Sequence, residues 1–522
     1  MISEMLEKVY HFLESCIKYI AVVPLLLLTI LVTLFQNTIS FDIIETSIIV
    51  QNGFKFFGVV VAAVVLLAVL YWLLRLIPEQ VLFFALALAY LFGGIYLITH
   101  IQMELRYDSG ICYCNALNFV EGNYTNLQFG EYFYKYPHQL GLVSYNCLLI
   151  QISDDPNLVY FVNLLWILVS NFFLWRTAVL VYEEHIRLRK LVILLSFAFM
   201  PQFFYLFYAY GQVPGLGCLM ISVYLTVRAI KKKSTLSMGL SMVFIALTCL
   251  LRMNYMIGGI ALLIVYLLHA LQRKQWIWGV ATVAVIFSMV LPRYFVDNYY
   301  EKAADTDLSQ GMPALLHVAM GLQENEEPWR AAGWYNDFND KTYLGTNCDV
   351  QASKKIAMDS IRERLQTFVH NPGYAVDFFG EKVITTWCEP TYQSVWSGPL
   401  ISMNCATEEE WLKNLYSGGS IFDMLASLMN VLIVMLFGFS LLFILWKAFW
   451  EKLPCNALEL FAVLFFLGGF LFHLFWETKS QYVYPYVVLL VPIAARGICV
   501  VFEGINKLVM TKGISKNVTS VE

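Results

Sequence analysis

Long apolar segments separated by short polar ones run along most of this chain. A helix needs ~20 apolar residues to cross the ~30 Å hydrocarbon layer of a membrane, and it satisfies its own backbone hydrogen bonds there. The pattern therefore predicts an all-α polytopic membrane protein with about twelve transmembrane helices. The predicted spans lie near 19–35, 56–77, 81–99, 157–181, 191–208, 213–230, 236–252, 255–271, 277–296, 421–446, 457–476 and 484–503.

Composition supports this class of protein. The chain of 522 residues is 59% hydrophobic and 14% charged, whereas soluble domains are roughly 25% charged. Its formal net charge of -4 is too small to indicate a nucleic-acid partner. The lipid bilayer is therefore the partner that composition predicts.

Basic clusters indicate which way the chain crosses the membrane. Short loops such as 187–190 and 231–233 are rich in Lys and Arg, and such loops stay in the cytoplasm. This predicts a multi-pass cell-membrane protein with both termini cytoplasmic and with loop 100–139 outside. The first span shows no small-residue cleavage motif, so we expect it to be retained. Residues 140–152 are apolar but short, and we expect a juxtamembrane or re-entrant helix there.

One long polar stretch, 297–420, divides the chain and is also predicted to face outward. It contains two helix-like patches, Gln351–Phe368 and Tyr374–Trp387, separated by Asn371-Pro372-Gly373, a helix stop. The expected organisation is an N-terminal membrane hairpin (1–80), a catalytic transmembrane module (81–296), an extracytoplasmic helical insertion (297–420) and a C-terminal transmembrane module (421–522). Below, 100–139 is called the first loop and 297–420 the insertion.

The first loop carries the most promising acidic residue. His100, Glu104 and Asp108 are spaced i, i+4, i+8, so a helix continuing out of the membrane would stack them on one face. An aspartate at the mouth of a helix bundle suits a general base or a group that orients an acceptor hydroxyl. A solvated loop with a helix-terminal acid is the simpler alternative.

Two basic residues are predicted on the outer side of the membrane, although Lys and Arg are usually enriched in cytoplasmic loops. Arg252 is predicted at the tip of a tight hairpin, and Lys479 lies in the short loop before the last span. Such cations suit an anionic partner such as a lipid phosphate, although snorkelling to lipid headgroups is the alternative for each. Gln212 lies at another hairpin tip, whose Gly and Pro residues explain the turn by themselves.

The order of these features resembles the C-type glycosyltransferase superfamily, which includes protein O-mannosyltransferases and aminoarabinose transferases. Uncharacterised bacterial membrane proteins of Gram-positive envelope-polysaccharide biosynthesis are a closer resemblance, covering the chain from about Val81. The matching segments are Arg106-Tyr107-Asp108, Tyr136-Pro137-His138-Gln139-Leu140-Gly141, Leu251-Arg252-Met253-Asn254, Trp387-Cys388-Glu389-Pro390-Thr391-Tyr392 and Glu477-Thr478-Lys479-Ser480-Gln481-Tyr482.

The resemblance implies an inverting hexosyl or pentosyl transferase. It would move a sugar from a polyprenyl-phosphate carrier to an envelope glycan, lipid or protein acceptor on the outer face. Asp108 would act as base, with Glu104 the next candidate, and Arg252 and Lys479 would hold the lipid phosphate. The further expected substrate contacts are His138, Glu389, Tyr482 and Gln212.

No cofactor is firmly expected, and a divalent metal stays open as an unsupported alternative. The superfamily often carries a paired acidic motif in the first loop, whereas Asp108 is followed by Ser109. A divalent metal therefore has no support from this motif, and no His-Glu-x-x-His pair or glycine-rich nucleotide loop occurs.

Two functions of other classes remain open at this point. A secondary transporter would have a similar number of spans, but transporters place polar sites near the membrane midplane, often within internal repeats. This chain shows no repeat and few ionisable residues at the centres of its spans. A non-catalytic subunit of an envelope-polysaccharide assembly complex would keep the fold without the activity.

Overall fold

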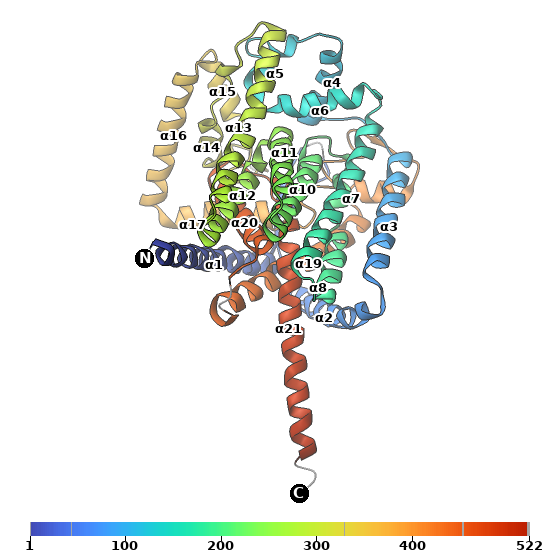
Figure 1. The fold of residues 1–522 in the computed structure, drawn as a ribbon. Helices are drawn as coiled ribbons and strands as arrows, with labels where there is room; N and C mark the ends of the chain where they lie inside the picture. Colours follow the sequence, from blue (N-terminus) through green and yellow to red (C-terminus); the bar gives the residue numbers. More distant parts are fainter. Residues whose placement is uncertain (1, 43, 328, 452–453, 519–522) are drawn as a thin grey trace.

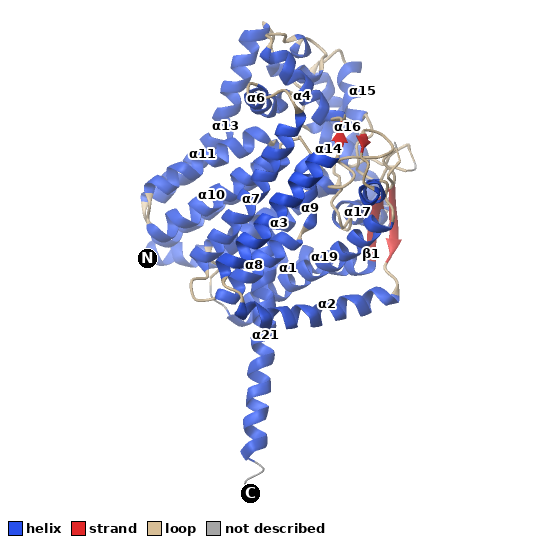
Figure 2. Cartoon of the chain, turned by 90° about the vertical axis from the view of Figure 1, so that its right-hand side faces the viewer, coloured by secondary structure: helices blue, strands red, loops and turns tan. Residues whose placement is uncertain are grey.

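The computed structural model describes residues 2–42, 44–327, 329–451 and 454–518 and is built almost entirely of helices (Figures 1 and 2). The N-terminal part contains α1 (Ile2–Leu34), β1 (Phe35–Ile39), β2 (Ser47–Gln51), α2 (Phe54–Leu73) and α3 (Glu79–His100). The next part contains β3 (Gln102–Met103), α4 (Tyr107–Val120), α5 (Tyr132–Lys135), α6 (Leu140–Ile150), α7 (Pro156–Val181), α8 (Ile186–Ala198), α9 (Met200–Phe204), α10 (Gln212–Lys232), α11 (Thr235–Leu251), α12 (Met256–Arg273) and α13 (Trp276–Ala304).

The insertion and the C-terminal part complete the chain. The insertion contains α14 (Leu315–Gly321), α15 (Phe338–Gly345), α16 (Val350–His370), α17 (Pro372–Trp387), β4 (Cys405–Ala406) and α18 (Glu410–Tyr416). The C-terminal helices are α19 (Ser420–Trp446), α20 (Ala457–Phe475) and α21 (Tyr484–Val518). Three 3₁₀ turns near the site are η3 (Pro137–Gln139), η5 (Met253–Tyr255) and η8 (Ser480–Tyr482).

The predicted class, an all-α polytopic membrane protein, is confirmed. Within the described residues, 10 helices are long and apolar enough to span a membrane, or up to 11 if the bent pair Ile186–Ala198 and Met200–Phe207 forms one span. Helix α11 is apolar but has only 17 residues. Each predicted span falls on one of the 10 long helices, on α11 or on the bent pair.

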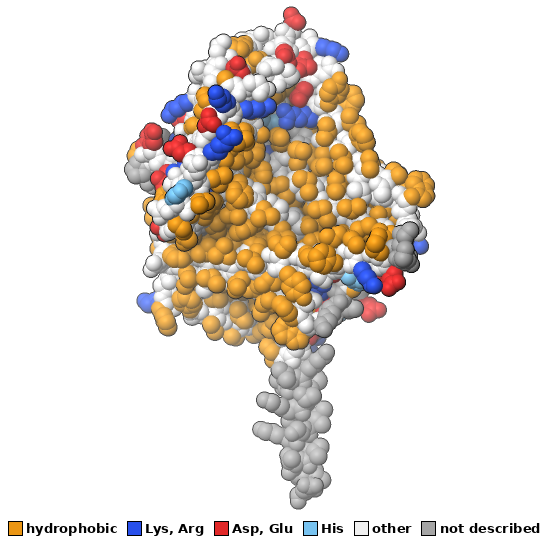
Figure 3. Space-filling view, turned by 90° about the vertical axis from the view of Figure 1, so that its left-hand side faces the viewer, with side chains coloured by type: hydrophobic (Ala, Val, Ile, Leu, Met, Phe, Trp, Pro, Cys, Tyr) orange, Lys and Arg blue, Asp and Glu red, His pale blue; other side chains and the backbone are white. Residues whose placement is uncertain are grey.

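Apolar side chains cover the outside of the bundle. Large apolar residues are exposed along α13, including Phe287 at 56% and Val290 at 54%, and along α2, including Val61 at 64%. Figure 3 shows one such face, where hydrophobic side chains cover the middle and charged ones gather toward the upper end. A surface of this kind is suited to contact with lipid.

The helices of the insertion form where the sequence predicts them. Asp349 caps α16 by accepting hydrogen bonds from the N–H groups of Gln351 (2.8 Å) and Ala352 (2.9 Å). The Asn371 side chain accepts from Tyr374 N–H (3.2 Å) at the start of α17, where Pro372 is the first helical residue. Proline is favoured at the first helical position because a backbone N–H there would have no hydrogen-bond partner within the helix.

The predicted helical extension from His100 to Asp108 is wrong. Helix α3 ends at His100, and β3 then pairs antiparallel with β4, so that Met103 lies opposite Cys405. Because this pairing holds the chain extended, α4 begins separately, at Tyr107 with φ 53°. His100, Glu104 and Asp108 therefore do not share a helix face.

Two further features position the site. Strands β1 and β2 form an antiparallel hairpin, which the sequence did not predict, and Asn37 N–H donates to Cys388 O (2.9 Å). Helix α6 lies across the upper end of the bundle beside α4 (Figure 1). With 11 residues it extends roughly 16 Å, too short to cross a membrane, as expected for a juxtamembrane helix.

Candidate active site

A large cavity of about 1390 Å³ lies between the β1–β2 turn, the first loop, the insertion and the loop before α21. Small-molecule sites typically measure roughly 300–1,000 Å³, so this cavity has room for two substrates. Its basic lining residues are Arg106, Lys135, Arg252, Arg293, Arg330, Lys341, Arg364 and Lys479. The candidates that the sequence suggested and that line the cavity are Asp108, His138, Arg252, Lys479 and Tyr482.

Two glycines allow close packing at the end of α11. A Cβ on Gly141 of α6 would lie 2.1 Å from Leu250 O, and one on Gly211 would lie 2.3 Å from Leu251 O. Gly211 also has φ +80°, a conformation that other residues rarely adopt. Both segments can therefore approach the α11 C-terminus, next to Arg252.

Asp108 lies in the first turn of α4 and is exposed. The Tyr210 hydroxyl donates to Asp108 Oδ2 (2.9 Å), and Gln139 Nε2 donates to the same hydroxyl. Burial, and next the charge of Asp108, raises the pKa of Tyr210 well above its usual value, so the phenol keeps its proton. The helix N-terminus also favours a negative charge here. Asp108 is thus an oriented, accessible carboxylate.

Arg252 is a half-buried cation between two aromatic rings. Its guanidinium carbon lies 4.3 Å from the Tyr210 ring centroid and 5.5 Å from that of Tyr482. It has no carboxylate partner among the residues that the structure describes. The cation–π contacts hold the guanidinium in place and leave its charge available to an anion. The predicted hairpin between α11 and α12 is confirmed.

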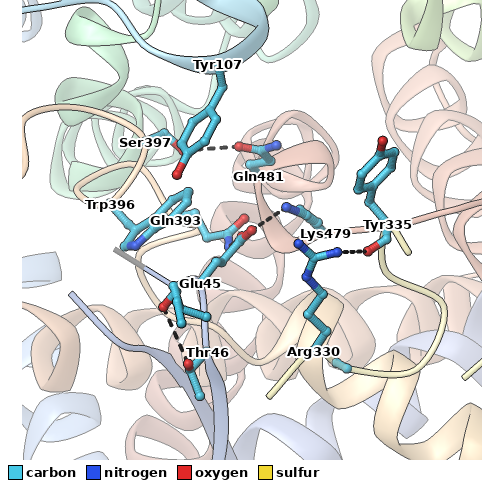
Figure 4. Close-up of polar contacts among 12 residues, drawn as sticks. Glu45, Thr46, Tyr107, Arg330, Tyr335, Gln393, Trp396, Ser397, Lys479 and Gln481 are labelled. Carbon is cyan, nitrogen blue, oxygen red and sulfur yellow. Dashed lines mark hydrogen bonds and ion pairs between the residues drawn. The ribbon is translucent and has the colours of Figure 1, made fainter. Parts of the chain in front are cut away.

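Lys479 is not a free cation, because it forms an ion pair with Glu45 of the β1–β2 turn (Figure 4). Both side chains are largely buried, at 18% and 15% exposed. Gln393 Nε2 also donates to Glu45 (2.6 Å), and the Lys479 ammonium lies 5.4 Å from the Trp334 ring centroid. The β1–β2 turn thus contributes a charged residue to the cavity.

His138 lies in η3 and its ring is 6.0 Å from that of Tyr136. Burial, followed by the positive charge of Arg293, lowers the pKa of His138 well below its usual value. The imidazole is therefore neutral at physiological pH. It can accept or donate a hydrogen bond without adding charge to the cavity.

Three candidates do not line the cavity. Glu389 is 1% exposed, and its oxygens accept from Thr391 N–H (3.0 Å) and the Ser480 hydroxyl (3.3 Å). It fastens the loop after α17 to η8, and burial raises its pKa to about 7. Glu104 is exposed outside the cavity, where its N–H donates to Asn404 O (3.0 Å). Gln212 is 2% exposed in the first turn of α10. None of the three is positioned to contact a substrate in this cavity.

Sequence reasoning missed three residues of the cavity wall. Tyr210 stands two positions before the chosen Gln212, and only the packing of Gly211 shows which side chain faces Asp108. Glu45 is a charged residue in the short polar break between the first two spans. Glu477 stands two positions before Lys479 and is a buried carboxyl, 8% exposed, that lines the cavity.

No group of three or more His, Cys, Asp or Glu side chains that could hold a metal ion occurs in the part of the chain that the structure describes. Three of the cations that line the cavity are paired with carboxylates, Lys135 with Asp340, Arg293 with Asp297 and Lys479 with Glu45. Arg252 and Asp108 are both in contact with Tyr210. The arrangement can therefore neutralise an anion beside a carboxylate that is free to accept a proton.

Comparison with known proteins adds one match. Residues 148–293 match the sequence profile of the family described as dolichyl-phosphate-mannose-protein mannosyltransferase. No curated protein and no solved structure matches the chain. The match includes Tyr210 and Arg252 but neither Asp108 nor Lys479. It supports a membrane glycosyltransferase with a polyprenyl-phosphate sugar donor. Over residues 148–293 the chain is thus similar to the mannosyltransferase family of the C-type glycosyltransferase superfamily that its motifs indicate.

Proposed function

We propose that this protein transfers a sugar from a polyprenyl-phosphate carrier to an envelope glycan, lipid or protein acceptor at the outer membrane surface. One observation carries the proposal. Asp108, an exposed carboxylate, and Arg252, a cation without a carboxylate partner, meet at Tyr210 in one large cavity. The family match over 148–293 supports the same donor class.

The proposed step is a single displacement at the anomeric carbon. Asp108 accepts the proton of the acceptor hydroxyl, or orients that hydroxyl. The oxygen of the acceptor hydroxyl forms the new bond to the anomeric carbon. The bond between the anomeric carbon and the phosphate oxygen breaks on the opposite face, so the configuration inverts. The lipid phosphate leaves with the electron pair, and Arg252 stabilises its charge.

The lipid chain of the donor needs an apolar path, and a small cleft of about 20 Å³ lies beside the cavity among the spanning helices. The cleft is lined by Leu250, Met256 and Met289 of the spanning helices α11, α12 and α13. It shares His138 and Arg293 with the main cavity. This volume holds about one water molecule, so we infer that the prenyl chain lies along the exposed apolar side of α13, with its phosphate near Arg252 and Arg293.

The sidedness of the protein is part of the proposal. Both termini would be cytoplasmic, and 1–80, 81–296 and 421–522 would be membrane modules with the insertion on the outer side. Labelling with an impermeant thiol reagent in a Cys114→Ser background tests this. Glu121→Cys should react on intact cells and Lys232→Cys should not, and the reverse pattern would show the opposite orientation.

The function itself is tested with purified protein, decaprenyl-phosphate sugars and envelope acceptor extracts. The proposal predicts that sugar transfer requires the lipid-linked donor. Glu121→Gln, on an exposed acid at the other end of α4, should retain activity. Transfer from a sugar nucleotide without any lipid carrier would overturn the proposed donor class.

A further inference from the structure

A second part of the cavity wall is a continuous strip of residues joined by side-chain contacts and one backbone hydrogen bond. Asn339 Nδ2 donates to the Tyr136 hydroxyl (3.2 Å), and the Tyr136 ring centroid lies 6.4 Å from that of His317. His317 stacks on Trp476, with centroids 5.6 Å apart and planes at 7°. Glu477 N–H donates to His317 O (3.1 Å). These five residues, all lining the cavity, are called the aromatic wall.

Two polar groups of the aromatic wall have no partner inside the protein. Glu477 is 8% exposed and Asn339 is 1% exposed. Within the described ranges, neither Glu477 Oε1 nor Asn339 Oδ1 accepts a hydrogen bond. Buried polar atoms are nearly always hydrogen-bonded, so both residues are suited to a ligand that donates.

The backbone of this wall is fixed from behind by a buried lysine. Lys382 of α17 is 1% exposed. Its ammonium donates to Trp476 O (2.9 Å) and to Gly321 O at the end of α14. Both carbonyls are thereby held by one group, which links the insertion to the loop before α21. Lys382 is therefore a positioning residue for the wall.

The chemistry of the aromatic wall fits a sugar better than a phosphate. Flat ring faces pack against the C–H groups of a pyranose, and hydroxyls donate to carboxylate and amide oxygens. A phosphate has no proton donors at neutral pH, and the Glu477 and Asn339 oxygens would repel it. His317 adds no charge, because burial lowers its pKa to about 4.

We propose that the aromatic wall is the subsite for the sugar ring of the lipid-linked donor, with Glu477 and Asn339 accepting hydrogen bonds from its hydroxyls. This inference rests on the proposed function and deepens it. The donor would lie with its phosphate at Arg252 and its sugar on the Trp476–His317 stack. The residues that choose the sugar would then come from the insertion and the loop before α21, outside the matched segment 148–293.

The test compares two kinds of lipid on the full-length protein in detergent. The probes are decaprenyl phosphate and decaprenyl phosphate carrying β-mannose, β-glucose or β-N-acetylglucosamine, and the dissociation constant is measured for each. Wild type should bind at least one glycosylated lipid more tightly than the bare phosphate. Trp476→Ala and Glu477→Gln should each weaken that lipid at least tenfold and change bare-phosphate binding by less than twofold.

Control variants separate a local effect from misfolding. Trp476→Phe keeps a ring and should retain most of the sugar-dependent affinity. Asn339→Ala leaves Trp476 unchanged and should still lose the sugar-dependent affinity. Trp411→Ala, at an exposed residue that does not line the cavity, should change neither affinity. Arg252→Ala should weaken both kinds of lipid.

Each other outcome overturns one claim. Equal loss of both lipids in the Trp476 and Glu477 variants, or no loss, would overturn the sugar subsite. So would a wild-type protein that binds bare and glycosylated lipids equally. If wild type binds neither kind of lipid, the proposed function itself fails.

Discussion

Lys479 forms an ion pair with Glu45, a residue 434 positions earlier in the chain. The pair joins the turn of the β1–β2 hairpin to the loop before α21, and Gln393 donates to the same carboxylate. The β1–β2 turn therefore belongs to the cavity wall, although it lies in the segment 1–80, before the part of the chain that the resemblance covers. The resemblance implies that Lys479 holds the lipid phosphate, and we therefore expect that phosphate to compete with Glu45 for the lysine.

Replacing Glu45 by Gln should therefore tighten the binding of decaprenyl phosphate, by roughly 3–10-fold, a change of ~1 kcal/mol. The variant leaves a largely buried ammonium without its carboxylate, and the lipid phosphate can take that place. Equilibrium binding to the purified protein measures the effect. Asp42→Asn, on an exposed acid of the same turn, serves as the control. Weaker binding by Glu45→Gln would refute the competition.

Tyr210→Phe should lower the single-turnover rate by about 10–100-fold while donor affinity stays within a few fold. The change removes the hydroxyl that orients Asp108, and hydrogen bonds to charged groups contribute ~1.5–3 kcal/mol. The aromatic ring at position 210, which contacts the Arg252 guanidinium, remains. Tyr208→Phe is the matched control, since Tyr208 also lines the cavity without bonding to Asp108. A Tyr210→Phe enzyme with normal turnover would show that Asp108 needs no such orientation.

Arg252→Ala should weaken binding of decaprenyl phosphate at least tenfold, ~1.4 kcal/mol or more, and should also slow turnover. The reason is that the phosphate is charged both in the bound donor and in the departing product. Arg252→Lys should recover part of the affinity but lose the planar contact with Tyr210. Arg228→Ala, at an exposed position of α10, tests for general charge effects. Unchanged affinity in Arg252→Ala would move the phosphate site elsewhere.

Glu477 should make stability fall as pH rises. Burial raises its pKa to about 7, while Lys479, Lys382 and Arg252 lower it and Asp108 raises it. Because the folded pKa exceeds the unfolded value of roughly 4.3, the folded state binds the proton more tightly. The stabilisation is complete below pH ~4.3 and is lost as pH rises through about 7.

Glu477→Gln removes this titration. The melting temperature of the variant minus that of wild type should therefore become more positive between pH 5 and pH 8. Trp411→Ala, at an exposed residue whose side chain does not titrate, should give a difference that does not change with pH. A Glu477→Gln difference that is equally flat would show that this carboxyl does not titrate in the range.

The sequence predicted features that depend on local patterns. The spans, the helix pair α16 and α17, and the hairpin that presents Arg252 all follow from hydropathy and from stop or cap residues. The positions of Asp108 and Lys479 depend instead on long-range pairing. Asp108 is set by β3 meeting β4 and by Tyr210, and Lys479 by Glu45. No spacing rule reveals such partners.

The same limit explains the candidates that lie outside the cavity. Glu389 was chosen for its motif, but its oxygens accept hydrogen bonds from Thr391 of its own loop and from Ser480 of η8. Gln212 was chosen as the polar residue of a turn, but the αL conformation of Gly211 leaves Gln212 buried. Side-chain direction at a turn depends on backbone angles that composition does not reveal.

The measurement that tests the account most directly is the single-turnover rate of Asp108→Asn with saturating lipid-linked donor. Asn keeps the shape and one acceptor oxygen but cannot take up a proton. The rate should fall by ~10²–10⁴-fold while the dissociation constant of the donor stays within a few fold of wild type. Glu121→Gln should keep the wild-type rate. Near-normal turnover by a folded Asp108→Asn protein would contradict the assignment of Asp108 as the base.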